Sequence, residues 1–151
     1  MHCLFLLVNI KRQIWLAKRF YIKSIWITWN LVDASAHYIL GAHILSTDKS
    51  VLLDLAKSVI MWERRIAMVA TWHFILRNEL EWTFKIAEIL LQDQHDLIHK
   101  AVGWMLREAG KKDEKKLCDF LDTHVRVMPR TALRYAIERF PEEVRKHYLG
   151  L

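Results

Sequence analysis

Trp29 and Asp33 are the two residues whose types and spacing most directly suggest chemistry. Both lie in a segment, Trp29–Asp33, that the pattern of apolar residues predicts to be helical. Residues four apart lie on one face of a helix, so the sequence places a carboxylate beside an indole. A fixed carboxylate can stabilise positive charge that develops on a substrate, and an indole face attracts a cation.

The charge of the chain favours an anionic partner without identifying it. There are 23 Lys and Arg residues against 17 Asp and Glu residues, which gives a formal net charge of +6. Such a surplus favours binding to nucleic acid or to another anionic surface. A basic surface that serves only solubility is equally compatible with this composition.

The composition indicates a single all-α domain over residues 1–151. Hydrophobic residues make up 53% of the chain and charged residues 26%, which is typical of a globular protein. Only 4 Gly and 2 Pro are present, fewer than sheets and barrels usually need for their turns. The two cysteines, Cys3 and Cys118, form no disulfide framework and predict a reducing, cytoplasmic location, next to the nucleoid if DNA is the partner.

The first 27 residues are predicted to form a divergent or truncated N-terminal helix region. The apolar run 4–10 ends at Lys11 and Arg12, far short of the ~20 residues that a membrane span requires, and no signal-cleavage site follows. No membrane partner is therefore expected. The region is either an amphipathic interfacial helix or the edge helix of a longer stack. Its apolar residues could also support self-association.

Apolar residues at steps of three and four predict a succession of helices joined by short connections. Pro141 is expected to end the last long helix, and Glu142 and Glu143 to begin a short terminal one. The predicted long helices span residues 29–45, 50–59, 62–77, 82–91, 95–110, 113–124 and 128–140.

A repeat of 33 to 34 residues relates these helices. Trp29, Trp62 and Asp96 each begin a long helix at this interval, and Ala34, Ala67 and Ala101 recur at the same spacing. Small residues repeated at one position let neighbouring helices approach closely. The pattern predicts a right-handed superhelical stack of HEAT-like antiparallel helix pairs, an α-solenoid. A plain helical bundle with accidental spacing is the alternative.

The repeat also aligns positive charges. Arg65, Lys100 and Arg134 fall at or near one position of successive units. On the concave face of a solenoid, such a stripe would follow a phosphate backbone. Further arginines and tryptophans are interleaved with the stripe, and the tryptophans suit either sugar and base contact or the core: Arg64, Arg107, Arg130, Trp29, Trp62 and Trp104.

Four short blocks occur in an order that one protein family shows. They are 29–41, 62–67, 103–108 and 128–136, within a stretch of about residues 21 to 149. On these blocks the chain resembles the AlkD-like DNA alkylation repair proteins. The resemblance implies a DNA glycosylase built from HEAT-like repeats, which removes positively charged N3- and N7-alkylated purines from double-stranded DNA. It implies no metal or organic cofactor.

The resemblance also implies roles for individual residues. Asp33 matches the catalytic carboxylate, Trp29 and Trp104 match tryptophans beside the sugar of the lesion, and Arg65 matches a backbone contact. Because an alkylated purine already carries positive charge, it leaves without a general acid, and the carboxylate stabilises the oxocarbenium-like sugar and orients water. The expected DNA-binding set is Trp29, Arg65, Trp104, Arg107, Arg130 and Arg134.

Other readings of the sequence stay open. The chain could be a helical-repeat module that binds nucleic acid through its arginines without chemistry, or a scaffold that binds protein. Family members are typically longer by about two helix pairs at the N-terminus, so an apolar end of the stack could be exposed. His95 and His99 are four apart on one helix, but no third ligand accompanies them, so no metal site is expected.

Overall fold

A computed structural model describes residues 49–150, and every regular element in this range is a helix. The all-α prediction is thereby confirmed for this part of the chain. Trp29, Asp33 and the predicted N-terminal region lie outside the described residues. The longest described helix has 15 residues, and none is long and apolar enough to cross a membrane. The helices are α4 (Val51–Ala56), α5 (Met61–Ala70), α6 (Trp72–Ile75), α7 (Glu81–Leu90), α8 (Asp96–Gly110), α9 (Glu114–His124), α10 (Arg130–Ala136) and α11 (Glu142–Gly150).

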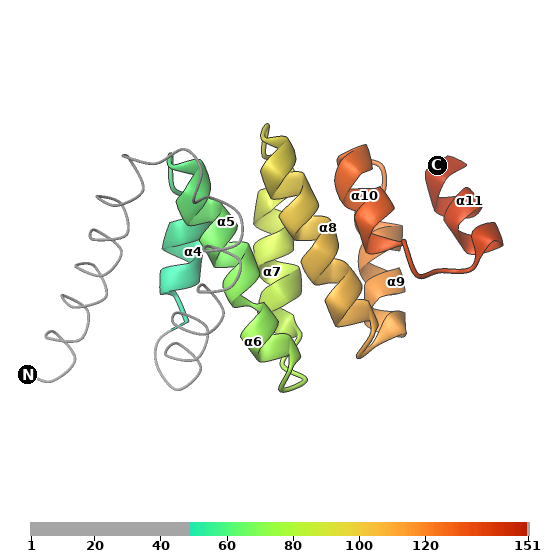
Figure 1. Cartoon of the computed structure of the whole chain (residues 1–151), viewed down its shortest axis with the longest axis horizontal. Helices are drawn as coiled ribbons and strands as arrows, with labels where there is room; N and C mark the ends of the chain where they lie inside the picture. Colours follow the sequence, from blue (N-terminus) through green and yellow to red (C-terminus); the bar gives the residue numbers. More distant parts are fainter. Residues whose placement is uncertain (1–48, 151) are drawn as a thin grey trace, which may run out of the picture. The chain divides into compact units, whose positions relative to one another are not determined.

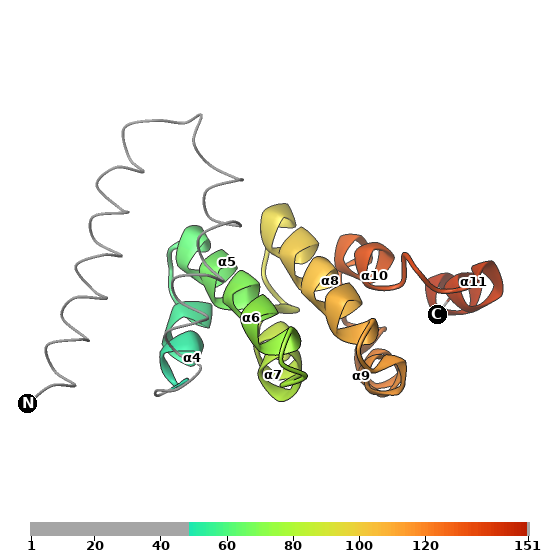
Figure 2. The same cartoon turned by 60° about the horizontal axis from the view of Figure 1, so that its bottom comes forward.

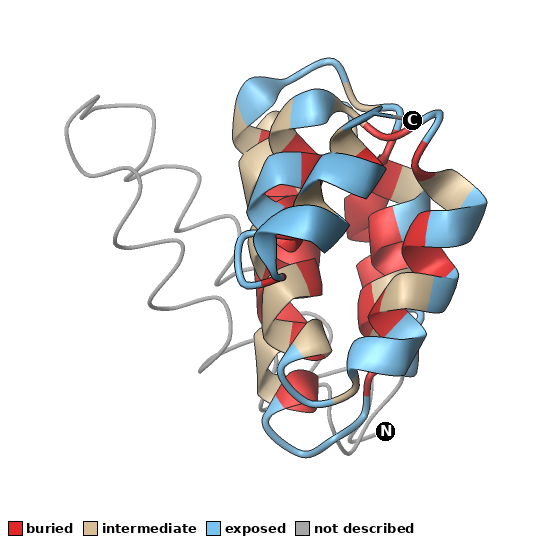
Figure 3. Cartoon of the chain, turned by 90° about the vertical axis from the view of Figure 1, so that its right-hand side faces the viewer, coloured by how far each residue is buried: buried red, intermediate tan, exposed pale blue. Residues whose placement is uncertain are grey.

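Most of these helices form two layers (Figures 1 and 2). In one layer α5 packs on α8, and α8 packs on α10. Behind it lie α4, α7 and α9, with α4 against α5 and α7, and α7 and α9 against α8. Phe84 and Phe120, whose ring centroids lie 5.4 Å apart, join α7 to α9. Buried residues lie mainly where these helices face one another (Figure 3), so the core runs between the layers.

The positions of the sequence repeat that the structure describes fall on the layer formed by α5, α8 and α10. Trp62 lies in the first turn of α5, Asp96 begins α8, and these two helices are neighbours. Ala67 and Ala101, the repeated small residues, are both fully buried. Equivalent positions of the repeat therefore fall on adjacent helices of one layer, as stacked helix pairs require.

Gly103 is the point at which α8 and α10 approach most tightly. A Cβ atom placed there would lie 2.4 Å from the carbonyl oxygen of Ala132 and 2.5 Å from Cβ of Tyr135. Both distances are below van der Waals contact, and one neighbour is backbone, so no side chain fits without moving α10. The repeat predicts close approach at Ala101, and the structure adds Gly103 one half-turn further along the helix.

The single helix predicted over 62–77 is wrong in one respect, because the chain forms two helices, α5 and α6, that meet at Thr71. The buried Thr71 hydroxyl donates to the Met68 carbonyl at 2.7 Å, and the Phe74 amide donates to the Thr71 carbonyl at 2.9 Å. These i to i+3 contacts tighten the backbone locally. Periodicity continues across such a joint and therefore does not reveal it.

Tyr148 attaches the terminal helix α11 to α9. The Tyr148 hydroxyl donates to a carboxylate oxygen of Asp122 at 2.8 Å, and the ring lies beside Phe140. Burial, followed by the hydrogen bond to Asp122, raises the pKa of the Tyr148 hydroxyl well above its usual value. Helix α11 begins at Glu142, as the sequence predicts, but the preceding helix α10 ends at Ala136 and not at Pro141 as expected.

Candidate nucleic-acid interface

All the predicted site residues within the described range lie on one layer. Arg65 comes from α5, Trp104 and Arg107 from α8, and Arg130 and Arg134 from α10. Since these three helices are neighbours in that order, residues up to 69 positions apart in the sequence share one layer of the structure. Trp29 and Asp33, the predicted chemical pair, lie outside the described residues.

Arg65 is almost completely buried, with 3% of its surface exposed. One terminal nitrogen of its guanidinium donates to the Leu97 carbonyl at 2.5 Å, in the first turn of α8. A buried guanidinium needs such acceptors, because desolvating a charged group is costly. Arg65 therefore connects α5 to α8, and its predicted contact with a DNA backbone stays a prediction.

Lys100 lies close to Arg65 on the neighbouring helix, where the repeat predicts a second cation. Its ammonium group forms an ion pair with Asp96 at 2.7 Å. That hydrogen bond raises the pKa of Lys100, whereas the positive charge of Arg65 opposes the rise. The same bond, and one from Thr131 on α10, lower the pKa of Asp96. A polar cluster thus forms where α5, α8 and α10 meet.

Trp104 is half-buried, and the edge of one indole meets the face of another. Its ring centroid lies 5.4 Å from that of Trp72, with an interplanar angle of 60°. Trp72 comes from α6 and is not among the site residues predicted from the sequence. It lies 32 positions before Trp104, close to the repeat interval, and this spacing is the signal that would have identified it. The pair fixes the orientation of the Trp104 ring.

The other three arginines of the predicted DNA-binding set differ in their partners. Arg107 is half-buried and forms ion pairs with Glu138 and, at 3.6 Å, with Glu108. Arg130 and Arg134 are exposed, lie four apart on α10, and have no ion pair within residues 49–150. Residues at this spacing share one helix face, so α10 presents two unneutralised guanidinium groups together.

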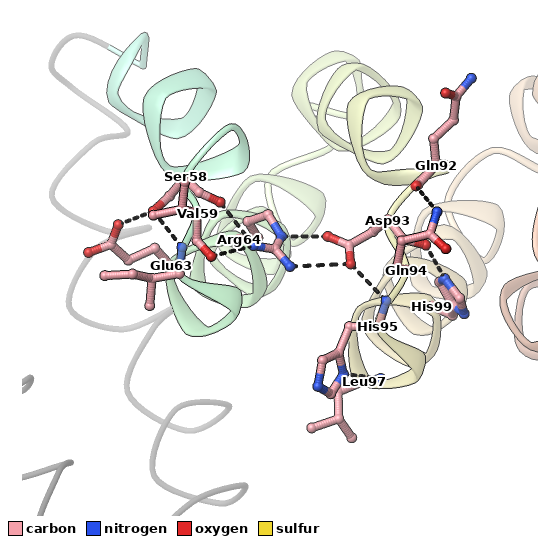
Figure 4. A network of polar contacts seen from close by, with 11 residues as sticks. Ser58, Val59, Glu63, Arg64, Gln92, Asp93, Gln94, His95, Leu97 and His99 are labelled. Carbon is pink, nitrogen blue, oxygen red and sulfur yellow. Dashed lines mark hydrogen bonds and ion pairs between the residues drawn. The ribbon is translucent and has the colours of Figure 1, made fainter.

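Arg64, predicted to lie near the stripe of cations, instead holds two loops together (Figure 4). Its guanidinium binds both oxygens of Asp93, at 2.5 and 3.3 Å, and donates to the carbonyls of Ser58 and Val59 at 2.9 and 3.1 Å. Asp93 also accepts from the His95 amide at 2.9 Å. The network fixes the loop before α5 against the loop before α8.

Acid is expected to weaken this network. Burial raises the pKa of Asp93, but the hydrogen bonds from Arg64 and from the His95 amide outweigh burial and lower it below the ordinary value of 3.8. Asp93 therefore contributes stability that is present above pH 3.8 and is lost as the pH falls through its lowered pKa. Asp93→Asn should lower the free energy of unfolding by about 1–3 kcal/mol at pH 7.

Urea unfolding of the wild type and Asp93→Asn across pH 7 to 2 checks this expectation. The difference between the two proteins should shrink as the wild-type carboxylate becomes protonated. Asp119→Asn, at an exposed position on α9, is the matched control and should change stability little at either pH. A difference that persists undiminished at pH 2 would contradict an ionic role for Asp93.

His95 and His99 each have a structural partner. Nδ1 of His95 accepts from the Leu97 amide at 3.3 Å and so caps α8, while Nε2 of His99 lies 2.6 Å from the Asp93 carbonyl. Over the described residues, no group of three or more His, Cys, Asp or Glu side chains is placed to hold a metal ion.

Comparison with models of known protein families identifies the family of the chain. The family model described as DNA alkylation repair enzyme matches residues 20–140, which include Trp29, Asp33 and all the helices from α4 to α10. No curated protein matches the chain. Because the family match spans most of the 151 residues, the chain belongs to the DNA alkylation repair enzyme family.

Proposed function

We propose that the protein is a DNA glycosylase that hydrolyses the N-glycosidic bond of positively charged N3- and N7-alkylated purines. The observation that carries the proposal is the family match over residues 20–140, because it includes Asp33 and Trp29 as well as the α5, α8 and α10 layer. The exposed arginines of α10 and the half-buried Trp104 support it, since they give that layer cations and an aromatic ring together.

The proposed reaction needs no general acid. The bond between C1′ of the sugar and the purine nitrogen breaks, and its electron pair neutralises the positive charge of the leaving base. Asp33, in its ionised form, stabilises the oxocarbenium-like sugar and orients a water molecule. The water oxygen bonds to C1′, and its proton passes to the carboxylate and on to solvent. Trp29 and Trp104 would each add about 0.5–2 kcal/mol of attraction for the cation.

The fold proposed for this function is a right-handed solenoid of HEAT-like helix pairs. The layer formed by α5, α8 and α10 would be its inner, concave face. Two findings support this assignment: the repeat interval falls on adjacent helices of that layer, and the predicted DNA-binding residues come from it. Arg130 and Arg134 would hold the DNA backbone with bidentate contacts to phosphate.

A comparison of a positively charged base with a neutral base tests this mechanism. The protein should release 7-methylguanine from methylated duplex DNA and leave uracil in a duplex of the same length, because neutral uracil is a poor leaving group without a general acid. Released bases are separated and counted by chromatography. Salt-dependent binding of both duplexes without release of either base would instead identify a non-catalytic binding module. Equal release of both bases would contradict a mechanism based on a cationic leaving group.

A further inference from the structure

A hollow of about 530 Å³ opens beside the C-terminal end of α8, between the start of α9 and the turn after α10. Four cationic residues line it: Arg107, Lys111, Lys112 and Arg139. Glu114 is the one carboxylate among its lining residues. Neither the predicted stripe of cations nor the proposed reaction assigns a role to Lys111, Lys112 or Arg139.

The positive charges around the hollow are incompletely neutralised. Glu108 binds the Lys111 ammonium group at 2.6 Å, and Glu138 pairs with Arg107. Lys112 and Arg139 are exposed, and neither forms an ion pair within the described part of the chain. An anion in the hollow would therefore meet two cations without an ion pair, Lys112 and Arg139. It would also meet Arg107 and Lys111, which already pair with glutamates. A phosphate group suits such a set, because lysine and arginine both donate charge-assisted hydrogen bonds to it.

The hollow shares Arg107 with the DNA-binding set predicted from the sequence. Trp104 and Arg107 lie at positions i and i+3 of α8, which share one helix face, and Lys111 follows the last residue of the helix. Along the helix axis, Trp104 and Lys111 are separated by roughly 10 Å at 1.5 Å per residue.

We infer that this hollow binds a backbone phosphate of duplex DNA. The inference rests on the proposed function, which places the lesion beside Trp104. Glu138 and Glu108 hold Arg107 and Lys111 in position when DNA is absent, and they compete with the phosphate for these cations. The contact is independent of sequence, so it contributes affinity and register rather than choice of lesion.

The double variant Lys112→Gln, Arg139→Gln tests the contact directly. Binding to an undamaged fluorescent duplex, measured between about 50 and 200 mM salt, should weaken roughly three- to tenfold, and the slope of log affinity against log salt should fall by about 1. The matched control, Lys57→Gln with Lys146→Gln, removes the same charge from exposed positions outside the hollow. Glu138→Gln removes a competing carboxylate and should tighten binding. Identical affinity and slope for the double variant and its control would overturn the inference.

Two further arms separate this inference from the proposed function. Absence of release from the wild type, with binding still dependent on the hollow, would overturn the glycosylase and keep the phosphate contact. Calorimetric binding of inorganic phosphate that the double variant loses, with DNA affinity unchanged, would assign the hollow to free phosphate and overturn the contact.

Discussion

Asp33→Asn is expected to reduce release of 7-methylguanine by at least roughly a hundredfold, because the amide cannot supply the negative charge that stabilises an oxocarbenium-like sugar. The side chain keeps its size and its capacity to accept a hydrogen bond, so only the charge is lost. Single-turnover release, with enzyme in excess over methylated duplex, measures the chemical step without product release.

Binding to undamaged duplex separates this effect from a loss of affinity. The dissociation constants of wild type and Asp33→Asn should agree within a few-fold, since removing an acidic group does not weaken contacts with phosphate. Arg134→Gln is the complementary variant: it should weaken duplex binding and leave the single-turnover rate at saturating DNA largely unchanged. A mutant at position 33 that releases base as fast as the wild type would remove Asp33 from the mechanism.

Gly103→Val is expected to destabilise the protein by about 3 kcal/mol, the largest loss of stability foreseen for a single substitution in the described helices. A side chain at this position must displace the Ala132 carbonyl and the Tyr135 side chain, which lie within 2.5 Å of the added Cβ. The backbone carbonyl cannot swing away as the end of a flexible side chain can. Helix α10 must therefore separate from α8, and it carries Arg130 and Arg134 with it.

The same substitution at Gly150 is the matched control. A Cβ atom at Gly150 meets nothing within 4 Å, so Gly150→Val should change the free energy of unfolding by less than about 0.5 kcal/mol. Urea unfolding followed by circular dichroism compares the two variants. Gly103→Val should also weaken duplex binding at temperatures where it stays folded. Equal midpoints for the two variants would show that α8 and α10 tolerate separation.

Much of the fold was predictable because it depends on local periodicity. Apolar spacing locates the helices, and α8, predicted over 95–110, spans Asp96–Gly110. The 33- to 34-residue interval also pairs helices of one layer correctly. The joint at Thr71 was not predictable from this spacing, because it arises from a buried hydroxyl that competes with the helix for the Met68 carbonyl.

The candidate site was less predictable, because ion pairs between helices determine which cations stay available. The sequence treats Arg64 and Arg107 as members or neighbours of one basic stripe. The structure pairs them with Asp93 and Glu138, 29 and 31 residues away, and no local pattern gives those partners. Arg130 and Arg134, by contrast, are exposed and unpaired within the described residues, as a backbone-binding role requires. The family resemblance, drawn from four short blocks, is confirmed by the match over residues 20–140.

Asp33 is proposed to give this chain glycosylase activity, and one measurement tests this role most directly. Purified wild type and Asp33→Asn, both shown to be folded and to bind duplex DNA, are incubated in excess with methylated duplex, and free 7-methylguanine is quantified over time. We predict release by the wild type and almost none by the mutant. Equal release by both, or no release by a wild type that binds the duplex, would contradict the claim.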